Sequence, residues 1–153
     1  MILKLNATSC EVAASILQVQ IPAYKIEANY LNSTAIPRLY DTVNDIQNCG
    51  ETFYGYFSVN KLVGFISFMQ EEQLIDIHRL VVSPDFFQKG IATKLLIYIF
   101  NMFPSSTTYI VQTGKANPPA IALYKKHGFL EVTDIKITDR MILTQLKKTE
   151  NIK

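Results

Sequence analysis

A segment at residues 80–93 combines residue types that could bind an anionic group. A predicted strand and turn lead there into a predicted helix, and Gly90 and Ala92 fall at the helix start. The first N–H groups of a helix have no partner within it and can donate to a phosphate. Gly90 permits close approach of a ligand, and Lys89 and Thr93 could add a charge and a hydroxyl. The alternative is an ordinary helix start with a glycine in its first turn. The segment contains neither of the nucleotide-binding motifs GxxxxGKS/T and GxGxxG.

The composition of the 153 residues is typical of one packed domain. Fifteen Lys and Arg against 13 Asp and Glu give a net charge of +2, which does not indicate a nucleic-acid partner. Cys10 and Cys49 fall in no metal-binding spacing, so we expect reduced thiols and no metal. The longest apolar run, residues 95–100, is far shorter than the roughly 20 residues that span a bilayer. With no apolar signal segment near the N-terminus, we expect a cytoplasmic protein without a membrane partner.

Hydrophobic periodicity and turn residues predict the element order ααβββαβαββ. A first helix should run to about Gln20, where Pro22 ends or kinks it, and a short helix should stop at Gly50. The later helices are predicted at 91–103 and 118–127, and the strands at 53–59, 62–69, 74–82, 108–112, 129–135 and 140–146. A helical crossover joins parallel neighbours, so strands 74–82 and 108–112 should lie parallel. The order indicates an α/β or α+β sheet with helices on its faces.

The segment at residues 80–92 resembles the cofactor-binding motif of the GNAT superfamily of N-acetyltransferases, Q/R-x-x-G-x-G/A after a strand that ends in L-x-V. Gly90 and Ala92 match the glycine and the final small residue. Phe87 stands where the family has Gln or Arg, and Gln88 is displaced by one position. This departure puts a side-chain contact in doubt, whereas binding by backbone amides would survive it.

A second segment, residues 117–129, resembles the family pattern N-x-x-A-x-x-L-Y-x-x-x-G-F at every named position, from Asn117 through Tyr124 to Phe129. The resemblance implies a single-domain acyl-CoA N-acyltransferase fold of class α/β (α+β). Its mixed central sheet should have about six to seven strands flanked by about four helices. We therefore expect one N-acetyltransferase domain over residues 1–146 and a polar tail at 147–153.

The resemblance implies acetyl-CoA as cosubstrate, without a metal and without a covalent enzyme intermediate. The pantetheine arm should lie against the strand at residues 80–82, held also by Asn117, with the pyrophosphate on the amides of the helix start. A backbone N–H near Val81 would stabilise the oxyanion. The residues that the resemblance assigns to acetyl-CoA are Leu80, Val81, Val82, Gln88, Lys89, Gly90, Ile91, Ala92, Thr93, Asn117 and Tyr124.

Direct attack by an amine requires loss of a proton, since an alkylamine has a pKa of about 10.4. His78 lies on the predicted cofactor strand, where family members carry a base, and an imidazole suits neutral pH. Asp76 shares its face by strand alternation and could serve as base or orient the ring. Glu51 is a further alternative, and a structural role for His78 also stays open.

Tyr124 matches the family tyrosine that protonates the departing thiolate of CoA, and a core aromatic is the alternative role. The amine acceptor is not readable from the sequence: a small molecule, a peptide N-terminus and a lysine side chain all remain open. Monomer and homodimer also both remain open. The competing function is a non-catalytic CoA-binding or regulatory domain of the same fold.

Overall fold

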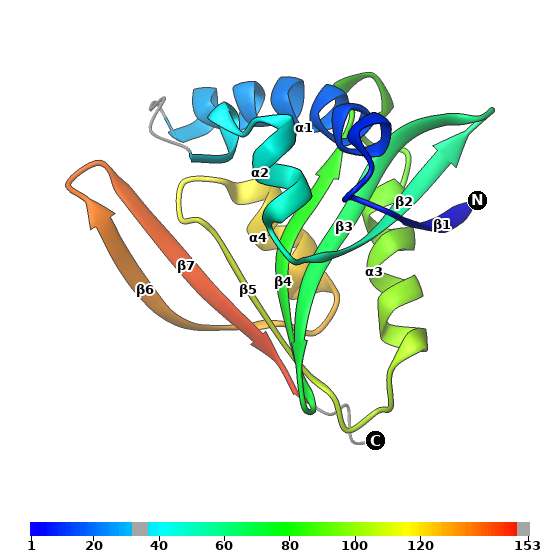
Figure 1. Cartoon of the computed structure of the whole chain (residues 1–153). Helices are drawn as coiled ribbons and strands as arrows, with labels where there is room; N and C mark the ends of the chain where they lie inside the picture. The colour runs from blue at the N-terminus through cyan, green and yellow to red at the C-terminus, as the bar shows by residue number, and fades with distance from the viewer. Residues whose placement is uncertain (32–36, 150–153) are drawn as a thin grey trace.

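Seven strands form one mixed sheet in the described part of this computed structural model, residues 1–31 and 37–149 (Figure 1). Their order across the sheet is β1-β2-β3-β4-β5-β7-β6. The strands are β1 (Ile2–Leu5), β2 (Thr52–Ser58), β3 (Lys61–Glu71), β4 (Leu74–Val82), β5 (Thr108–Gly114), β6 (Leu130–Thr138) and β7 (Met141–Lys148). β4 and β5 are parallel, as predicted, and the other neighbouring pairs are antiparallel.

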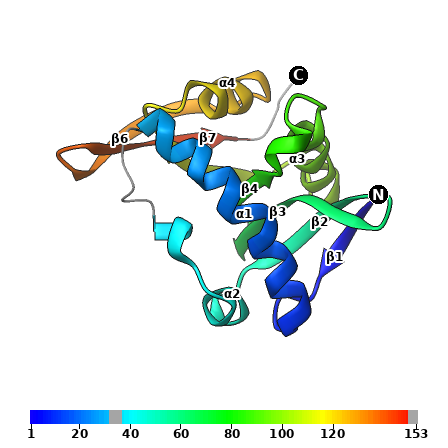
Figure 2. The ribbon, with the colours of Figure 1, turned by 90° about the horizontal axis from the view of Figure 1, so that it is seen from above.

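Helices cover both faces of this sheet (Figures 1 and 2). The helices are α1 (Cys10–Leu31), α2 (Val43–Asn48), α3 (Ile91–Met102) and α4 (Pro118–Lys126), with 3₁₀ turns η1 (Pro37–Tyr40) and η2 (Pro84–Phe86). One buried cluster joins Leu95 and Leu96 of α3 to the sheet, and another joins Ile16 of α1 and Ile46 of α2 to it. The result is a three-layer arrangement, and it confirms the predicted mixed sheet with flanking helices.

The burial of β3 follows from this layering. Residues 62–68 of β3 are all buried, because helices cover both faces of the central strand. Val63 and Ile66 pack in the cluster of α3, whereas Phe65 packs in the cluster of α1.

β4 and β5 separate before either strand ends. Their paired residues run from Leu74 and Thr108 to Ile77 and Val111, while β4 continues to Val82 and β5 to Gly114. Beyond Ile77, the edge of β4 that faces β5 therefore has no strand partner among the described residues. This divergence opens the middle of the sheet to the layers above and below it.

A β-bulge interrupts β4 just where the two strands separate. Ser67 and Phe68 of β3 pair with Arg79 and Ile77, so His78 is an extra residue in the ladder. Strict alternation would place His78 and Arg79 on opposite faces of the sheet. With the bulge, both side chains reach the carboxylate of Glu51.

α1 extends well beyond the predicted end near Gln20, and Pro22 lies inside it. A proline within a helix costs about 3 kcal/mol, which led us to end the helix early. Packing of the later turns offsets this cost, because Tyr24 and Ala28 contact Met141 and Leu39. The extension carries the last turns of α1 across the gap between β4 and β5.

Other boundaries differ more modestly from the prediction. β1 was not predicted, since four residues are too few to show a period, and it pairs with β2. The predicted short second helix divides into η1 and α2, because Thr42 begins α2 with a capping box to Asp45. β7 includes Lys147 and Lys148, which we had assigned to the tail, and residues 150–153 of that tail lie outside the described residues.

Candidate active site

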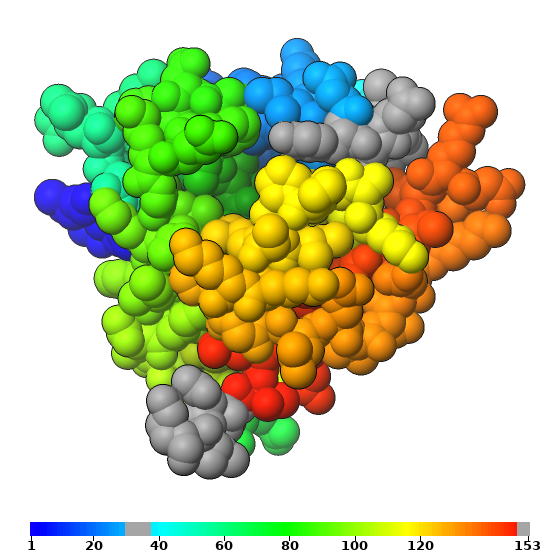
Figure 3. Space-filling model, turned by 180° about the vertical axis from the view of Figure 1, so that it is seen from behind, coloured from blue at the N-terminus to red at the C-terminus, as the bar shows by residue number. Residues whose placement is uncertain are grey.

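A cavity of about 480 Å³ lies between the end of β4, the start of α3, and helices α1 and α4. We call it the donor cavity. It is lined by ten of the eleven predicted cofactor residues: Leu80, Val81, Val82, Gln88, Gly90, Ile91, Ala92, Thr93, Asn117 and Tyr124. Lys89 does not line it. Figure 3 shows the face that carries α3 and α4, where residues 84–93 in green adjoin the start of α4 in yellow.

The start of α3 is shaped for close approach by a ligand. Gly90 is the N-cap residue, with a φ of 77°, and as a glycine it has no side chain to cap the first amides of the helix. Gln88 also has a positive φ, of 61°. A Cβ added at Gly90 would meet no atom within 4 Å, so the space in front of the first amides is open. Backbone N–H groups in such a turn form a concave site for an anion.

A second cavity, of about 650 Å³, lies on the side of α1, η1 and the β6–β7 hairpin. We call it the acceptor cavity. Its ionisable side chains come from four separate parts of the chain. These are α1 with Tyr24 and Glu27, the segment before α2 with Arg38 and Asp41, β4 with Asp76, His78 and Arg79, and α4 with Tyr124. Ile137, Met141 and Leu143 of the hairpin supply apolar surface opposite them.

The two cavities share part of their walls. The residues that line both are Tyr24, Glu27, Leu80, Asn117, Ala120 and Tyr124. These residues come from α1, β4, and α4 with its N-cap residue, around the gap between β4 and β5. A molecule in each cavity could therefore meet the other at this junction.

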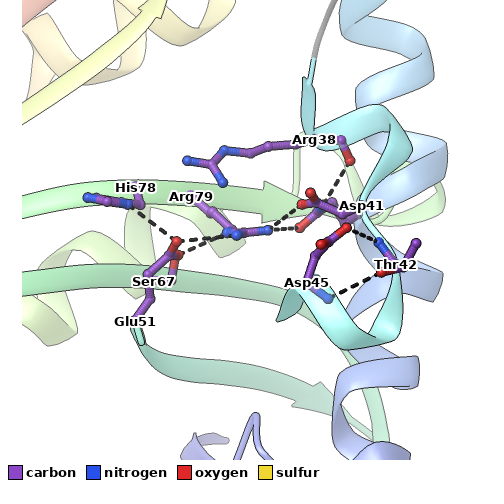
Figure 4. A network of polar contacts seen from close by, with 9 residues as sticks. Arg38, Asp41, Thr42, Asp45, Glu51, Ser67, His78 and Arg79 are labelled. Carbon is purple, nitrogen blue, oxygen red and sulfur yellow. Dashed lines mark hydrogen bonds and ion pairs between the residues drawn. The ribbon is translucent and has the colours of Figure 1, made fainter. Parts of the chain in front are cut away.

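Arg79 is the centre of a buried polar network beside the acceptor cavity (Figure 4). Its Nη1 donates to Asp41 Oδ2 at 2.8 Å and to Gln20 Oε1 at 2.9 Å, and its Nε donates to Glu51 Oε1 at 2.9 Å. The network ties α1, the segment before α2 and the start of β2 to β4. A buried arginine with these partners is satisfied, and the contacts fix the walls of the cavity.

Glu51 is held in its ionised form by this network. Burial acts against the charge, but hydrogen bonds from Arg79 and from Ser67 Oγ, at 2.6 Å, lower the pKa of Glu51 below its ordinary value. A carboxylate with a lowered pKa is a weak base. The geometry therefore favours an orienting role for Glu51 over the role of general base.

His78 lies between two carboxylates. Its Nδ1 is 3.3 Å from Glu51 Oε2, and its Nε2 is 3.3 Å from Asp76 Oδ2. Glu51 is buried, whereas the side chains of His78 and Asp76 remain partly exposed to the acceptor cavity. The fold thus brings together the three residues that the sequence offered as separate candidates for a base.

Tyr124 and Tyr24 present phenols at the junction of the cavities. Burial raises the pKa of each phenol well above its ordinary value, and the charge of Glu27 adds to the effect at both. Both phenols are therefore neutral near pH 7 and can donate a proton or a hydrogen bond. Tyr124 also packs edge-on against Phe129, so it has contacts of a core aromatic as well.

Asn117 begins α4 as its N-cap, with its side-chain oxygen accepting from the backbone N–H of Ala120 at 3.4 Å. It is buried and lines both cavities. Capping alone would explain an asparagine at this position, and contact with a cofactor stays a prediction.

The sequence did not show that Arg79, Asp41 and Gln20 form a network, or that Glu27 reaches the junction. Arg79 stands in a strand of mostly apolar residues, which signals a buried charge that needs partners. The identity of those partners carries no local signal, because they lie 28 to 59 positions away.

Two further observations concern metals and membranes. Within the described residues, no group of three or more His, Cys, Asp or Glu side chains could hold a metal ion, and Cys10 and Cys49 are free. No helix in residues 1–31 or 37–149 is both long and apolar enough to cross a membrane.

The comparisons with known proteins name a family with this fold. Residues 17–129 match the family model described as the Acetyltransferase (GNAT) family, and the chain therefore belongs to that family. UPF0157 protein YqkA of Bacillus subtilis (strain 168) is 38% identical to it over 133 residues, which are 87% of this chain and 39% of that protein. The chain thus spans about two fifths of the length of this curated relative.

Solved structures show the same fold. PH1933 from Pyrococcus horikoshii OT3 has a TM-score of 0.78 at 26% identity, over 99% of both chains. The ribosomal-protein-S18-alanine N-acetyltransferase from Escherichia coli has a TM-score of 0.77 at 17% identity, over 100% of this chain and 95% of that one. PaiA N-acetyltransferase from Thermoplasma acidophilum, solved in complex with coenzyme A, has a TM-score of 0.71 at 18% identity, over 97% and 98%.

Proposed function

We propose that this chain is an acetyl-CoA-dependent N-acetyltransferase that acetylates a primary amine by direct attack in a ternary complex. The observation that carries the proposal is the junction of the donor and acceptor cavities at Leu80, Glu27 and Tyr124. Two bound molecules can meet there without a covalent enzyme intermediate. The similarity to a PaiA N-acetyltransferase solved with coenzyme A supports a CoA site in this fold.

In this proposal the backbone binds most of the cofactor. The first amides of α3 hydrogen-bond the pyrophosphate of acetyl-CoA, where Gly90 leaves open space. The pantetheine arm lies along β4 beyond Ile77, where the edge of the strand has no partner from β5. The N–H of Val81 then stabilises the oxyanion that forms when the amine attacks the thioester carbonyl.

We assign His78 as the general base. Glu51 stays ionised and accepts from Nδ1–H of the neutral imidazole, so the lone pair of His78 lies on Nε2. Nε2 takes the proton that the amine nitrogen loses as its bond to the carbonyl carbon forms. The carboxylate of Asp76, 3.3 Å from Nε2, stabilises the resulting imidazolium. Glu51 and Asp76 act in this scheme as positioning residues.

Tyr124 is the proposed residue that stabilises the leaving group. When the bond from carbon to sulfur breaks, the thiolate, whose thiol has a pKa near 8.5, accepts a hydrogen bond from the neutral phenol and takes its proton from solvent. Tyr124 lines both cavities, so its hydroxyl belongs to the region where sulfur and amine meet. Asn117, in the same region, would hold the pantetheine arm.

Calorimetry with CoA, followed by measurement of thiol release from acetyl-CoA with a panel of primary amines, tests the proposal. Cys10 is a free and exposed thiol, so a reaction without amine serves as the blank. We expect CoA binding and amine-dependent thiol release. A rise in melting temperature with CoA, without turnover of any amine, would indicate a CoA-binding domain instead. No binding of CoA at millimolar concentration would overturn both functions.

A further inference from the structure

Two charged side chains of the acceptor cavity, Glu27 and Arg38, have neither a hydrogen bond nor an ion pair to their charged groups among the described residues. The backbone oxygen of Arg38 accepts from Gln20 Nε2 at 2.9 Å, but no contact is drawn to its guanidinium in Figure 4. Both side chains are only partly exposed. A partly buried charge without a partner is costly, and a ligand of opposite charge removes that cost.

The other charged groups of the cavity already have partners. Arg79 is bound by Glu51 and Asp41, and Asp76 contacts His78. Glu27 and Arg38 are thus the charged side chains of the cavity without an ion pair or a hydrogen bond to their charged groups, among residues 1–31 and 37–149. The unpaired set is thus complementary to a molecule that carries both signs.

The side chains of Glu27 and Arg38 lie at different distances from the junction of the two cavities. Glu27 lines both cavities, so a group bound to it lies where the acetyl group is transferred. Arg38 lines the acceptor cavity but not the donor cavity, so a group bound to it lies farther from the thioester.

Tyr24 connects the two positions. It lies one turn before Glu27 on α1 and therefore on the same helix face. After burial, the charge of Glu27 is the next cause that raises the pKa of Tyr24, while Arg38 acts in the opposite direction. Glu27 and Arg38 are therefore both within electrostatic range of one phenol, and a small molecule could bridge them.

We propose that the acceptor is a zwitterionic primary amine: its ammonium group is bound by Glu27 at the cavity junction, and an anionic oxygen group on the same molecule is bound by Arg38. This inference rests on the proposed acetyltransferase function and names its substrate class. The planar guanidinium matches a carboxylate or a phosphate with two parallel hydrogen bonds. Glu27 accepts hydrogen bonds from the ammonium and keeps the nitrogen beside the thioester; the ammonium loses its first proton to solvent, and His78 takes the second as the bond to the carbonyl carbon forms.

Matched amines test the inference by thiol release from saturating acetyl-CoA with the full chain. Glycine, 4-aminobutanoate and 6-aminohexanoate are each compared with the corresponding primary amide, which keeps the length and removes the negative charge. 2-Aminoethyl phosphate is compared with ethanolamine, which separates a phosphate from a carboxylate as the preferred anion. The variants are Arg38→Gln and Glu27→Gln, with Arg140→Gln and Glu11→Gln as controls at exposed positions outside both cavities.

We expect at least one anionic amine to exceed its neutral partner about tenfold in kcat/KM, as a hydrogen-bonded charge pair would give. Arg38→Gln should reduce that ratio to about one. Glu27→Gln should lower kcat/KM about tenfold for both members of the pair, mainly through KM, with unchanged CoA affinity. The two control variants should behave as wild type.

The inference would be overturned, and the acetyltransferase function left intact, if each neutral amine has a kcat/KM equal to or higher than that of its anionic partner. An unchanged ratio in Arg38→Gln would have the same consequence. If every probe is inert in turnover, the melting temperature of the CoA complex is measured with each probe, and no selective rise with the anionic amines also overturns it. Loss of CoA binding in the wild type would instead contradict the proposed function itself.

Discussion

The donor cavity and the acceptor cavity are built in different ways. The predicted cofactor residues of the donor cavity come from two short stretches, residues 80–93 and 117–124, and many contribute backbone or small side chains. The acceptor cavity depends on side chains from α1, the segment before α2, the start of β2, and β4. A binding site made of amides at a helix start is local in sequence, whereas a site made of ion pairs depends on the whole fold.

The departure at Phe87 illustrates the difference. Phe87 stands where the family carries Gln or Arg, and its side chain lines the donor cavity while remaining 41% exposed. The amides at the start of α3 are unaffected by that side chain, and the left-handed φ at Gly90 is retained. The acceptor cavity has no such tolerance, because removal of one buried charge leaves its partner unpaired.

The largest expected effect is at the donor cavity. Gly90→Glu should weaken CoA binding by more than about 200-fold, because a carboxylate beside the pyrophosphate costs several kcal/mol. Calorimetry with CoA measures the loss. Gly50→Glu is the matched control, since Gly50 has a φ of 75° and equally open space but lies outside both cavities. If both variants bind CoA as the wild type does, α3 is not the phosphate site.

The next effect concerns the base in the acceptor cavity. His78→Gln should lower kcat about 100-fold, the usual scale for loss of a general base. It should also change the pH profile of kcat, because the group that accepts the proton of the amine is absent. The affinity for CoA should not change, because His78 does not line the donor cavity. A variant with the wild-type pH profile would eliminate His78 as the base.

Tyr124→Phe tests the junction of the two cavities. Its kcat should fall about 30-fold, because the thiolate loses a hydrogen bond of the charge-assisted kind. CoA affinity should change little, since the ring still fills the same space. Tyr98→Phe, at an exposed position on α3 outside both cavities, is the control. Equal turnover in the two variants would reduce Tyr124 to a packing role.

The smallest effect is on stability. Burial raises the folded-state pKa of Glu27, so its ionisation destabilises the native chain. The neutral carboxyl of Glu27 favours the folded chain relative to the ionised carboxylate. This contribution to stability is fully present below the unfolded pKa, about 4.3, and is lost as the pH rises through the folded-state pKa. The free energy of unfolding of Glu27→Gln should therefore be about 1 kcal/mol higher than that of the wild type at pH 8. Near pH 4 the two free energies of unfolding should be nearly equal.

Urea unfolding at the two pH values measures this difference. Glu11→Gln, at an exposed position on the same helix, is the control and should show no gain at pH 8. A gain for Glu27→Gln that is the same at both pH values would show that the charge of Glu27 is not the cause.

Sequence reasoning recovered most elements of the fold. β4 matches its predicted range of 74–82, and α3 ends one residue before its predicted end. Those elements carry strong hydrophobic periods and clear turn residues. The extension of α1 past Pro22 was missed, because packing of Tyr24 and Ala28 against the β6–β7 hairpin outweighs the local cost of proline. That error hid the position of Glu27.

The sequence alone determined that residues 80–93 lead from a strand into a glycine-containing helix start and that Asp76 and His78 are two positions apart on one strand, because these are properties of neighbouring residues. The roles of His78 and Tyr124 are predictions from the family resemblance. Only the tertiary structure shows that Glu51 lies against Nδ1 of His78 and that, against the effect of burial, hydrogen bonds from Arg79 and Ser67 lower the pKa of its carboxyl. The bulge at His78 turns that side chain and Arg79 toward one carboxylate, and the ion pairs of Arg79 reach across the chain. Long-range pairing of charges depends on which elements pack together, and no short stretch of sequence encodes it.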